Sequence, residues 1–462
     1  MARTAPKSRP KTRTKHSVVF TWLQRNQGPV AAWSLILLGF ATRFFLFGYP
    51  NQTVFDEVYF GRFVGNYFTG NYFFDIHPPF GKLLIAGFAK LLGYNPTSSF
   101  ASIGTVFNDN GYLILRFLPS IAGMLLPVIV YGIARELGLK NRTAFLAGLA
   151  IVFENALLAQ SRFVLIDSLL LMFGFASLWL YLVWRRRKQW WLIVLAAASA
   201  GMAGSIKWTA LIFIVLPLFI EIVRWPGWRR LIKVSAVYLV IPLVLYVSFF
   251  AIHLTILDKT GDGDVFMSTR FQATLQGSSY QNTGQPPITL WGKIIEANRE
   301  MYAANARLTA GHPYGSKWYT WPFMLRPISY WVQGNAAIWL IGNPLVWWGS
   351  TAGVIALFLL VVTRKLNLVE LDAALIVLIG FAISWLPFAT ISRVMFLYHY
   401  LIPLTFAVLA TAVVINRFSL KAQSVIAVLI GLCFVLFAPA SYGIGISQQI
   451  LNLRMWLPTW RS

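Results

Sequence analysis

The residues whose types could do chemistry gather in one polar stretch, VFDEVYFGRFVGNYFTGNYFFDIHPPFGKLL, which lies between two long apolar segments. Its candidate acid–base groups are Asp56, Glu57, Asp75, His77 and Lys82. A carboxylate can take a proton from an incoming hydroxyl group, and a cation can hold a negatively charged group beside it. For one isolated acidic pair, a solvated loop would be the simpler interpretation. Charge beside a lipid-buried segment is costly, however, so this concentration of ionisable groups indicates a functional loop.

The composition indicates a polytopic membrane protein. Of the 462 residues, 57% are hydrophobic and only 12% are charged, whereas a soluble domain has roughly a quarter of its residues charged. The net charge of +24 could indicate a nucleic-acid partner. The basic residues cluster in short loops, however, where they set topology and contact anionic lipid, so we expect no nucleic acid. With a single cysteine, Cys433, neither a disulfide within the chain nor a cysteine metal site can organise the fold.

Helical spans should position the polar stretch, and a span needs about 20 mostly apolar residues. Eleven segments fit, which predicts an all-α protein. They are residues 30–48, 112–134, 143–160, 163–184, 190–206, 208–224, 231–253, 344–363, 371–389, 396–415 and 423–443. The first lacks a cleavage site of small residues, so we interpret it as a retained span and not a signal peptide.

The basic residues also predict the orientation, because Lys and Arg concentrate in cytoplasmic loops. A cytoplasmic N-terminus makes every inside connection basic and puts the C-terminus outside. The chain then divides into a basic cytoplasmic tail (1–29), spans one to seven (30–253) with a first outer loop (49–111), a large extracytoplasmic loop (254–343), and spans eight to eleven with an outer tail (344–462). We expect a multi-pass protein of the cell (plasma or inner) membrane with an extracytoplasmic site.

Both outer loops carry helical patterns. Residues 80–93 have their apolar positions on one face, which predicts a helix in the membrane interface. Residues 290–311 predict a second amphipathic helix, which ends at Gly311. We expect the aromatic residues that follow it to lie at the level of the lipid headgroups; they are Trp318, Trp321, Phe323 and Trp331.

A second set of polar residues falls at the outer ends of the predicted spans. They are Arg116, Glu154, Arg162, Asp167, Lys207, Arg393, Tyr398 and His399. Singly, an arginine near a helix end commonly extends to the headgroups, and Glu154 and Asp167 could form ion pairs that pack helices. We interpret His253, at the end of a span, as structural. A one-sided layer of so many ionisable groups nevertheless predicts a site open to the outer face.

The chemistry of that layer suits group transfer from a lipid phosphate. Arg116, Arg162, Lys207 and Arg393 could bind a phosphate through charge-assisted hydrogen bonds and stabilise it as it departs. Asp56 could act as the base toward an incoming hydroxyl group.

Seven stretches of the chain resemble protein O-mannosyltransferases. FDEVYFGRF and FDIHPPFGKLL are similar to the first outer loop of that family. Five later stretches resemble further motifs of the family, in the same order. They are LRFLPSIAG, FENALLAQSRFVLIDSLLLMF, SIKWTAL, NARLTAGHPYGSKWYTWPFMLRPISYW and MFLYHYLIPL. The resemblance implies a GT-C glycosyltransferase fold of family GT39 with eleven spans. It also implies inverting transfer of mannose from polyprenyl- (dolichyl-)phosphate-mannose to Ser/Thr hydroxyls of secreted or membrane proteins.

The resemblance implies roles for individual residues. The catalytic base and its acidic neighbour would be Asp56 and Glu57. The donor phosphate and lipid would be bound by Arg116, Lys207, Arg393, His399, Tyr398 and Arg162. The acceptor side and the loop that closes the site would comprise His77, Lys82, His312, Trp318, Trp321 and Arg326. Glu154 and Asp167 would form structural ion pairs.

Two features depart from the family pattern. Tyr59 stands where members often have histidine, and residues 254–343 have no room for the MIR module of eukaryotic members, which indicates a bacterial type. The expected partners are the lipid donor, a Ser/Thr-containing acceptor polypeptide, with the secretion machinery as a candidate source, and membrane lipids. We expect no cofactor; a divalent metal beside Asp56, Glu57 and His77 stays an alternative, since such residues are also common outside metal sites.

Two other functions remain open from the sequence. One is a GT-C transferase that moves another sugar, such as aminoarabinose, onto a lipid. The other is a transporter that uses the charged layer as a gate, although the chain shows no internal repeat and few charges at mid-depth.

Overall fold

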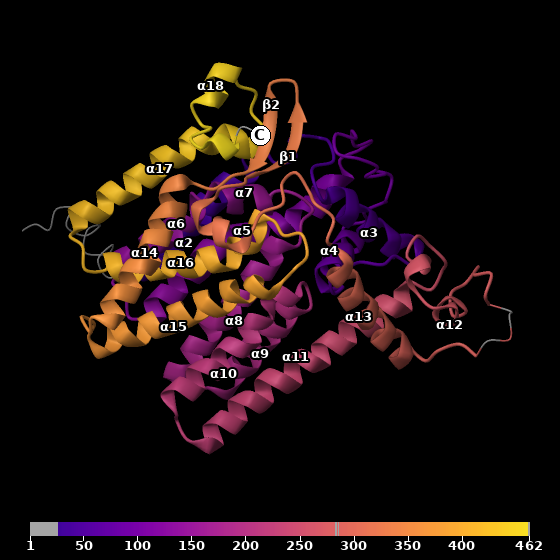
Figure 1. Ribbon diagram of the computed structural model, residues 1–462, viewed down its shortest axis with the longest axis horizontal. Coiled ribbons are helices and arrows are strands. Elements are labelled where there is room, and N and C mark those ends of the chain that lie inside the picture. The colour runs from indigo at the N-terminus through magenta and orange to yellow at the C-terminus, as the bar shows by residue number, and fades with distance from the viewer. Residues whose placement is uncertain (1–25, 282–283, 285, 461–462) are drawn as a thin grey trace, which may run out of the picture.

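The computed structural model describes residues 26–281, 284 and 286–460 and shows a helical bundle with further segments along its top and its right side (Figure 1). Most of the predicted cytoplasmic tail lies outside the described residues. The bundle helices are α2 (Gln27–Phe44), α5 (Gly111–Glu136), α6 (Asn141–Val152), α7 (Asn155–Ser161), α8 (Asp167–Arg187), α9 (Trp190–Gly204), α10 (Ile212–Arg224), α11 (Trp228–Ile256), α14 (Pro344–Val362), α15 (Leu368–Trp385), α16 (Leu401–Ile415) and α17 (Leu420–Tyr442). The other elements are α3 (Glu57–Thr69), α4 (Phe80–Leu91), α12 (Thr269–Gln272), α13 (Leu290–Arg307), α18 (Gln448–Asn452), β1 (Ile328–Gln333) and β2 (Ala336–Leu340).

Helices occupy all eleven predicted apolar segments. Seven helices of the described residues are long and apolar enough to cross a membrane, and the bent pair α6 and α7 would make an eighth. The other predicted spans correspond to α2, α9 and α10, which have 18, 15 and 13 residues. The chain is therefore a multi-span membrane protein, while the count of eleven crossings and their orientation stay predictions.

The bend between α6 and α7 is 58° and has a local cause. Glu154 adopts an extended backbone conformation between the two helices, and its carboxylate accepts a hydrogen bond from the amide of Leu157 (2.8 Å). A carboxylate that caps a new helix start satisfies an amide that the interrupted helix would leave free. One predicted span is thus two helices joined at a buried acidic residue.

Helices that are apolar on all sides form the centre of the bundle. Nearly every residue of α16 is buried, and the helix packs against α14, α15 and α6. Helix α8 packs between α5 and α9. Glycine permits close approach at one contact, because a Cβ atom on Gly353 of α14 would lie 2.0 Å from Oγ1 of Thr411 in α16.

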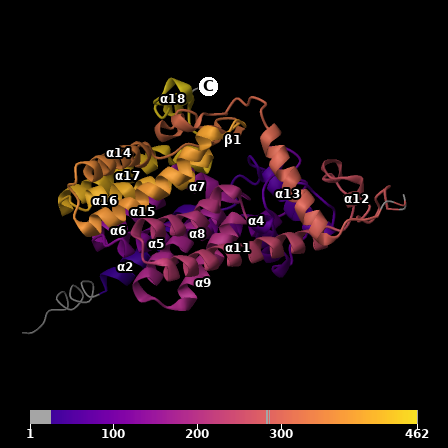
Figure 2. The ribbon, with the colours of Figure 1, turned by 60° about the horizontal axis from the view of Figure 1, so that its bottom comes forward.

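The two predicted outer loops are tied to each other. Lys259 bridges Asn71 on one side and Gln276 on the other. Gly261 lets the backbones meet, since a Cβ atom there would lie 2.3 Å from the carbonyl oxygen of Tyr72. Figures 1 and 2 show α3, α4, α12 and α13 together on the same side of the bundle. The predicted helices at 80–93 and 290–311 are confirmed as α4 and α13, with α13 ending at Arg307.

A β-hairpin was not predicted. Strands β1 and β2 pair antiparallel, and Gly334 at their turn has a φ of 58°. The hairpin packs against α17 and α7. Trp331 in β1 is 2% exposed and donates to the side chain of Gln52 (2.7 Å), and Trp321 is fully buried. Both tryptophans are therefore covered by protein, and their place at headgroup level stays a prediction.

Candidate active site

Asp56 immediately precedes α3 and leaves its carboxylate free. Its backbone carbonyl accepts a hydrogen bond from the amide of Tyr59, whereas its side chain has no hydrogen-bond partner among the described residues. Burial raises the pKa of the Asp56 carboxyl to about 7; Lys207 opposes this shift and the nearby Asp167 adds to it. A half-buried carboxyl with a pKa near neutrality is suited to accept a proton.

Glu57 and Arg116 form a closed pair inside the protein. Both side chains are fully buried, and Nη2 of Arg116 lies 2.7 Å from Oε2 of Glu57. The other guanidinium N–H groups donate to Oε1 of Glu57 and to the carbonyls of Gly48, Pro50 and Gln52. All five N–H groups of the guanidinium are thus used. In this structure Arg116 holds the chain that leads to Asp56, and its predicted phosphate-binding role stays a prediction.

Glu57 is equally saturated. Besides the arginine, its carboxylate accepts hydrogen bonds from the backbone amides of Val54 (2.9 Å) and Val164 (2.8 Å). Four donors on the two carboxylate oxygens leave no acceptor site for a substrate. In this structure Glu57 is a positioning residue beside the candidate base, and its predicted part in catalysis stays a prediction.

Arg162 and Glu154 also have structural partners. Arg162 donates to the carbonyls of Phe45, Leu46 and Ser441, and its guanidinium lies over the ring of Tyr442. These bonds use both N–H groups of Nη2 and one of Nη1, while Nε has no partner among the described residues, so its predicted binding of donor phosphate stays a prediction. Glu154 accepts from the amides of Leu157 and Asn343 and has no ion pair among the described residues, which corrects its predicted pairing.

A cavity of about 450 Å³ opens beside these elements. Its polar lining includes His77, Asp167, Lys207, Arg393, Tyr398 and His399, from four separate stretches of the chain. The rest of its wall is largely apolar, with contributions from α8, α10, α15 and α16. Asp56 is not among the lining residues, but the preceding residue, Phe55, contacts Tyr398 of the lining, with ring centroids 6.3 Å apart. Lys207 and Asp167 of the lining are also close enough to shift the pKa of Asp56. The cavity therefore joins a charged end to an apolar wall.

Two cations in the cavity keep unused donors. Nζ of Lys207 lies 2.8 and 2.9 Å from the two carboxylate oxygens of Asp167, which confirms the predicted ion pair of that aspartate and leaves one ammonium N–H without a partner among the described residues. Arg393 donates to the side chain of Asn305 and to the carbonyl of Val394, while its Nη2 has no partner there. Both side chains can therefore still receive an anion.

The HPPFGK segment splits into a cavity residue and an anchor. His77 lines the cavity, and burial, followed by the charges of Lys207 and Lys82, lowers the pKa of its imidazole well below its usual value. Lys82 donates to Asp75 and to the carbonyls of His77 (3.0 Å) and Pro78 (3.1 Å). Its three N–H groups are used, so Lys82 anchors this segment here, and its predicted acceptor-side role stays a prediction.

The predicted closing segment packs against the same wall without lining the cavity. Trp321 stacks on His399, with ring centroids 5.8 Å apart, and Trp318 contacts Trp385. Arg326 donates twice to the carbonyl of Pro313, and His312 accepts from the amide of Tyr314. The roles of these four predicted residues in closing the site stay predictions.

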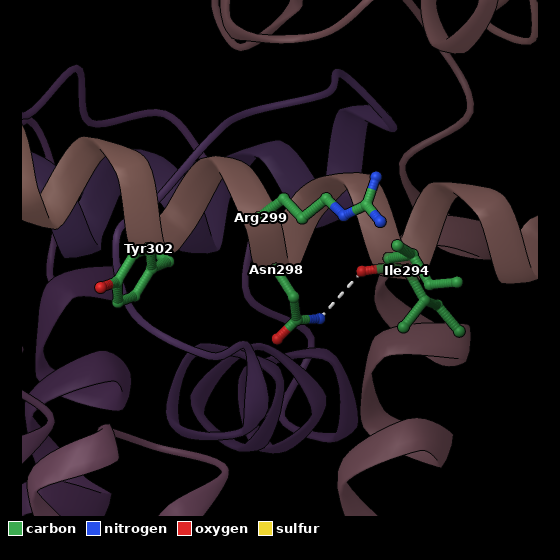
Figure 3. A pocket seen from close by; sticks show the side chains of 5 residues that line it. Ile294, Asn298, Arg299 and Tyr302 are labelled. Atoms are coloured by element: carbon green, nitrogen blue, oxygen red, sulfur yellow. Dashed lines mark hydrogen bonds between the residues drawn. The ribbon is translucent and has the colours of Figure 1, made fainter.

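Helix α13 contributes residues that the sequence did not single out. Asn305 orients Arg393, and Tyr302 lines the cavity while being 71% exposed. Tyr302 also borders a second pocket of about 510 Å³ on the same helix, with Asn298 and Arg299 (Figure 3). The amphipathic pattern predicted the helix, but nothing in the sequence alone indicated which face meets Arg393.

No three histidine, cysteine or acidic side chains lie close enough to hold a metal ion in the part of the chain that the structure describes. The donor set therefore gives no support to the alternative of a divalent metal beside Asp56.

Comparisons with known proteins agree with this arrangement. The family model described as "Dolichyl-phosphate-mannose-protein mannosyltransferase" matches residues 33–258, and that described as the "C-terminal four TMM region of protein-O-mannosyltransferase" matches residues 290–460. Protein O-mannosyltransferase 1 of Drosophila melanogaster is 34% identical over 283 residues, which are 57% of this chain and 32% of that protein. Dolichyl-phosphate-mannose–protein mannosyltransferase 1 of Saccharomyces cerevisiae is 22% identical and covers 89% of this chain and 80% of its own.

Solved structures share the fold. The S. cerevisiae Pmt1–Pmt2 complex bound to the sugar donor matches with a TM-score of 0.87 at 20% identity, over 94% of this chain and 92% of that one. The oligosaccharyltransferase of Archaeoglobus fulgidus matches with a TM-score of 0.56 at 14% identity, over 94% of this chain and 58% of its own. These likenesses show a GT-C fold. The chain spans about a third of the length of several curated relatives, including the Drosophila protein. Two family models that together cover most of its length nevertheless show that this chain belongs to the protein O-mannosyltransferase family.

Proposed function

We propose that this protein transfers mannose from a polyprenyl-phosphate-mannose donor to Ser or Thr hydroxyls of polypeptides at the outer face of the membrane. The observation that carries the proposal is a free carboxylate, Asp56, beside a cavity with two incompletely paired cations and an apolar wall. Family membership supports the sugar and the acceptor class.

The base acts on the acceptor. Asp56 takes the proton from the Ser or Thr hydroxyl, and the oxygen attacks the anomeric carbon from the side opposite the phosphate. The new carbon–oxygen bond forms as the bond to the phosphate oxygen breaks, which inverts the anomeric carbon. A single displacement of this kind needs no second carboxylate as nucleophile, unlike a retaining glycosidase.

The cations act on the leaving group. The free N–H groups of Lys207 and Arg393 would donate to the lipid phosphate, where negative charge grows in the transition state. The largely apolar remainder of the cavity, between α8, α10, α15 and α16, suits the first isoprenoid units of the donor. Asp167 holds Lys207 in place, and the buried pair of Glu57 and Arg116 fixes the start of α3.

The test uses purified protein in lipid nanodiscs with labelled polyprenyl-phosphate-mannose and a Ser/Thr-rich peptide. We expect labelled mannose on peptide hydroxyls and release of polyprenyl phosphate in equal amounts. Parallel reactions offer a lipid acceptor with a polyprenyl-phosphate aminoarabinose donor, and sealed vesicles test solute flux. Transfer to the lipid acceptor, or flux without glycosylated peptide, would overturn the proposal.

A further inference from the structure

A second charged cavity lies at the opposite end of the bundle. It has a volume of about 220 Å³ and is lined by four cations and two carboxylates: Arg185, Arg186, Lys188, Arg230, Glu136 and Asp372. Helix α8 connects the two sites, because Asp167 at its first residue lines the candidate active site and Arg185 to Arg187 form its last turn. Twenty-one helical residues rise about 30 Å, the thickness of a bilayer core.

The cavity has more positive than negative charge. Each carboxylate in its wall already has a cation: Arg186 donates to Glu136 at 2.8 Å, and Asp372 lies between Arg185 and Arg224. Arg230 pairs with Glu221 behind the wall (2.6 Å). Lys188 has no ion-pair partner among the described residues. Burial, and then the charges of Arg230 and Arg185, lower the pKa of its ammonium group, as expected where cations crowd together.

Topology alone does not require this convergence. Positive charge that only orients a membrane protein can lie anywhere in the short loops of one face. Here the cations lie in or directly beside two different connections, α8–α9 and α10–α11, and meet carboxylates from the ends of α5 and α15 around one cavity. Figure 1 shows the turn between α10 and α11 at the lower edge of the bundle, away from α3 and α4.

Exposed tryptophans mark the depth of this cavity. The same two connections carry Trp190 (69% exposed), Trp225 (51%) and Trp228 (66%). Exposed tryptophan at the ends of membrane helices is typical of the headgroup layer, where its ring lies among lipids and its N–H group meets water. A ligand of the cavity would therefore be at the level of lipid phosphates.

We propose that this cavity binds the phosphate headgroup of an anionic phospholipid in the leaflet opposite the candidate active site. The tips of Arg186 and Lys188, which are exposed, donate to the phosphate, and Arg230 contributes charge from the wall. Basic pockets between membrane helices bind acidic headgroups in this way. Binding holds the ends of α5, α8, α11 and α15 together and therefore stabilises the folded chain by mass action. The proposal does not depend on the glycosyltransferase activity.

The test measures thermal unfolding of the purified full chain while short-chain phosphatidylglycerol is titrated into neutral detergent, with phosphatidylcholine as reference. Each cation near an anionic lipid is worth about fivefold in affinity, so Arg186→Gln with Lys188→Gln should raise the half-saturating concentration of phosphatidylglycerol roughly 25-fold. The matched control is Arg364→Gln with Lys421→Gln. It removes the same charges from exposed positions at the ends of α14 and α17 outside the cavity, and should titrate like the wild type.

A variant that is expected to strengthen lipid binding keeps the test decisive if the double variant folds poorly. Glu136→Gln removes the carboxylate that pairs with Arg186 and should tighten phosphatidylglycerol binding. Equal titrations for the wild type and the cavity variants would overturn the proposal, as would an equal loss in the control, which would indicate surface charge alone. Inorganic phosphate and glycerol phosphate form the last arm. If either compound stabilises the protein at the concentration at which the lipid does, the ligand of the cavity is a soluble phosphate and the lipid proposal is overturned.

Discussion

Removing Arg116 should damage the fold of the first outer loop before it affects donor binding. Its guanidinium makes two hydrogen bonds to Glu57 and three to the backbone carbonyls of Gly48, Pro50 and Gln52, without exposure to solvent. Arg116→Met leaves a buried carboxylate without its cation and the buried carbonyls of Pro50 and Gln52 without donors, while that of Gly48 keeps the hydroxyl of Tyr112. Breaking such a pair by removing one partner costs about 3–5 kcal/mol.

The assay combines thermal unfolding in detergent with mannosyl transfer measured over a range of donor concentrations. We expect Arg116→Met to lower the unfolding temperature and the amount of active enzyme, with little change in the donor KM of the molecules that remain folded. Arg116→Lys should rescue little, because an ammonium group offers three donors in place of a planar fork of five. The double variant Arg116→Met with Glu57→Gln should be more stable than Arg116→Met alone, since it removes the stranded charge.

The control is Arg62→Met in the same loop. Arg62 is exposed and donates only to the carbonyl of Val58 among the described residues, so its loss should change stability by less than about 0.5 kcal/mol. A stable Arg116→Met protein whose only defect is a raised donor KM would refute this reasoning and support the phosphate role predicted from the sequence.

Two further predictions concern the cavity. Mannosyl transfer should increase as pH rises through about 7, because Asp56 works as the carboxylate and its pKa is raised to about 7; a rate that is flat from pH 5 to about 9 would contradict this. Lys207→Met should move that midpoint to higher pH, because the lysine lowers the pKa of Asp56, and should weaken donor binding by about 1.5–3 kcal/mol, the worth of a charge-assisted hydrogen bond. The matched control is the double variant Lys207→Met with Asp167→Asn, which also removes the carboxylate of Asp167 that Lys207→Met leaves without its cation. If donor binding recovers in this double variant, Lys207 does not contact the phosphate.

Apolar segment length predicted the helices because a bilayer imposes it. Its limits appear at Glu154, where a buried carboxylate ends one helix and caps the next, and at α10, whose 13 residues are short for a crossing. The hairpin was missed because its strands, ISYWVQ and AAIWL, follow an aromatic-rich segment that equally suits a membrane interface.

The sequence predicted the layer of ionisable groups at the outer ends of the spans, but not which of these groups pair with each other. Depth along a helix follows from sequence, so the sequence placed Lys207, Asp167 and Arg393 at one level. Which cation faces the cavity depends on helix rotation and on loop carbonyls that fold back, as those of Gly48 and Pro50 do onto Arg116. Sequence periodicity does not contain this information, so Arg116 and Lys207 looked equivalent although only Lys207 keeps a free donor.

The most direct test of the account is the turnover of Asp56→Asn. The amide keeps the size of the side chain, and because no hydrogen bond to the Asp56 carboxylate exists among the described residues, folding and donor binding should be unchanged. With labelled polyprenyl-phosphate-mannose and a Ser/Thr-rich peptide, we expect the rate of transfer to fall by about 10²–10⁴-fold, the contribution of a general base. Turnover near the wild-type rate by a folded, donor-binding Asp56→Asn protein would contradict the assignment of Asp56 as the base.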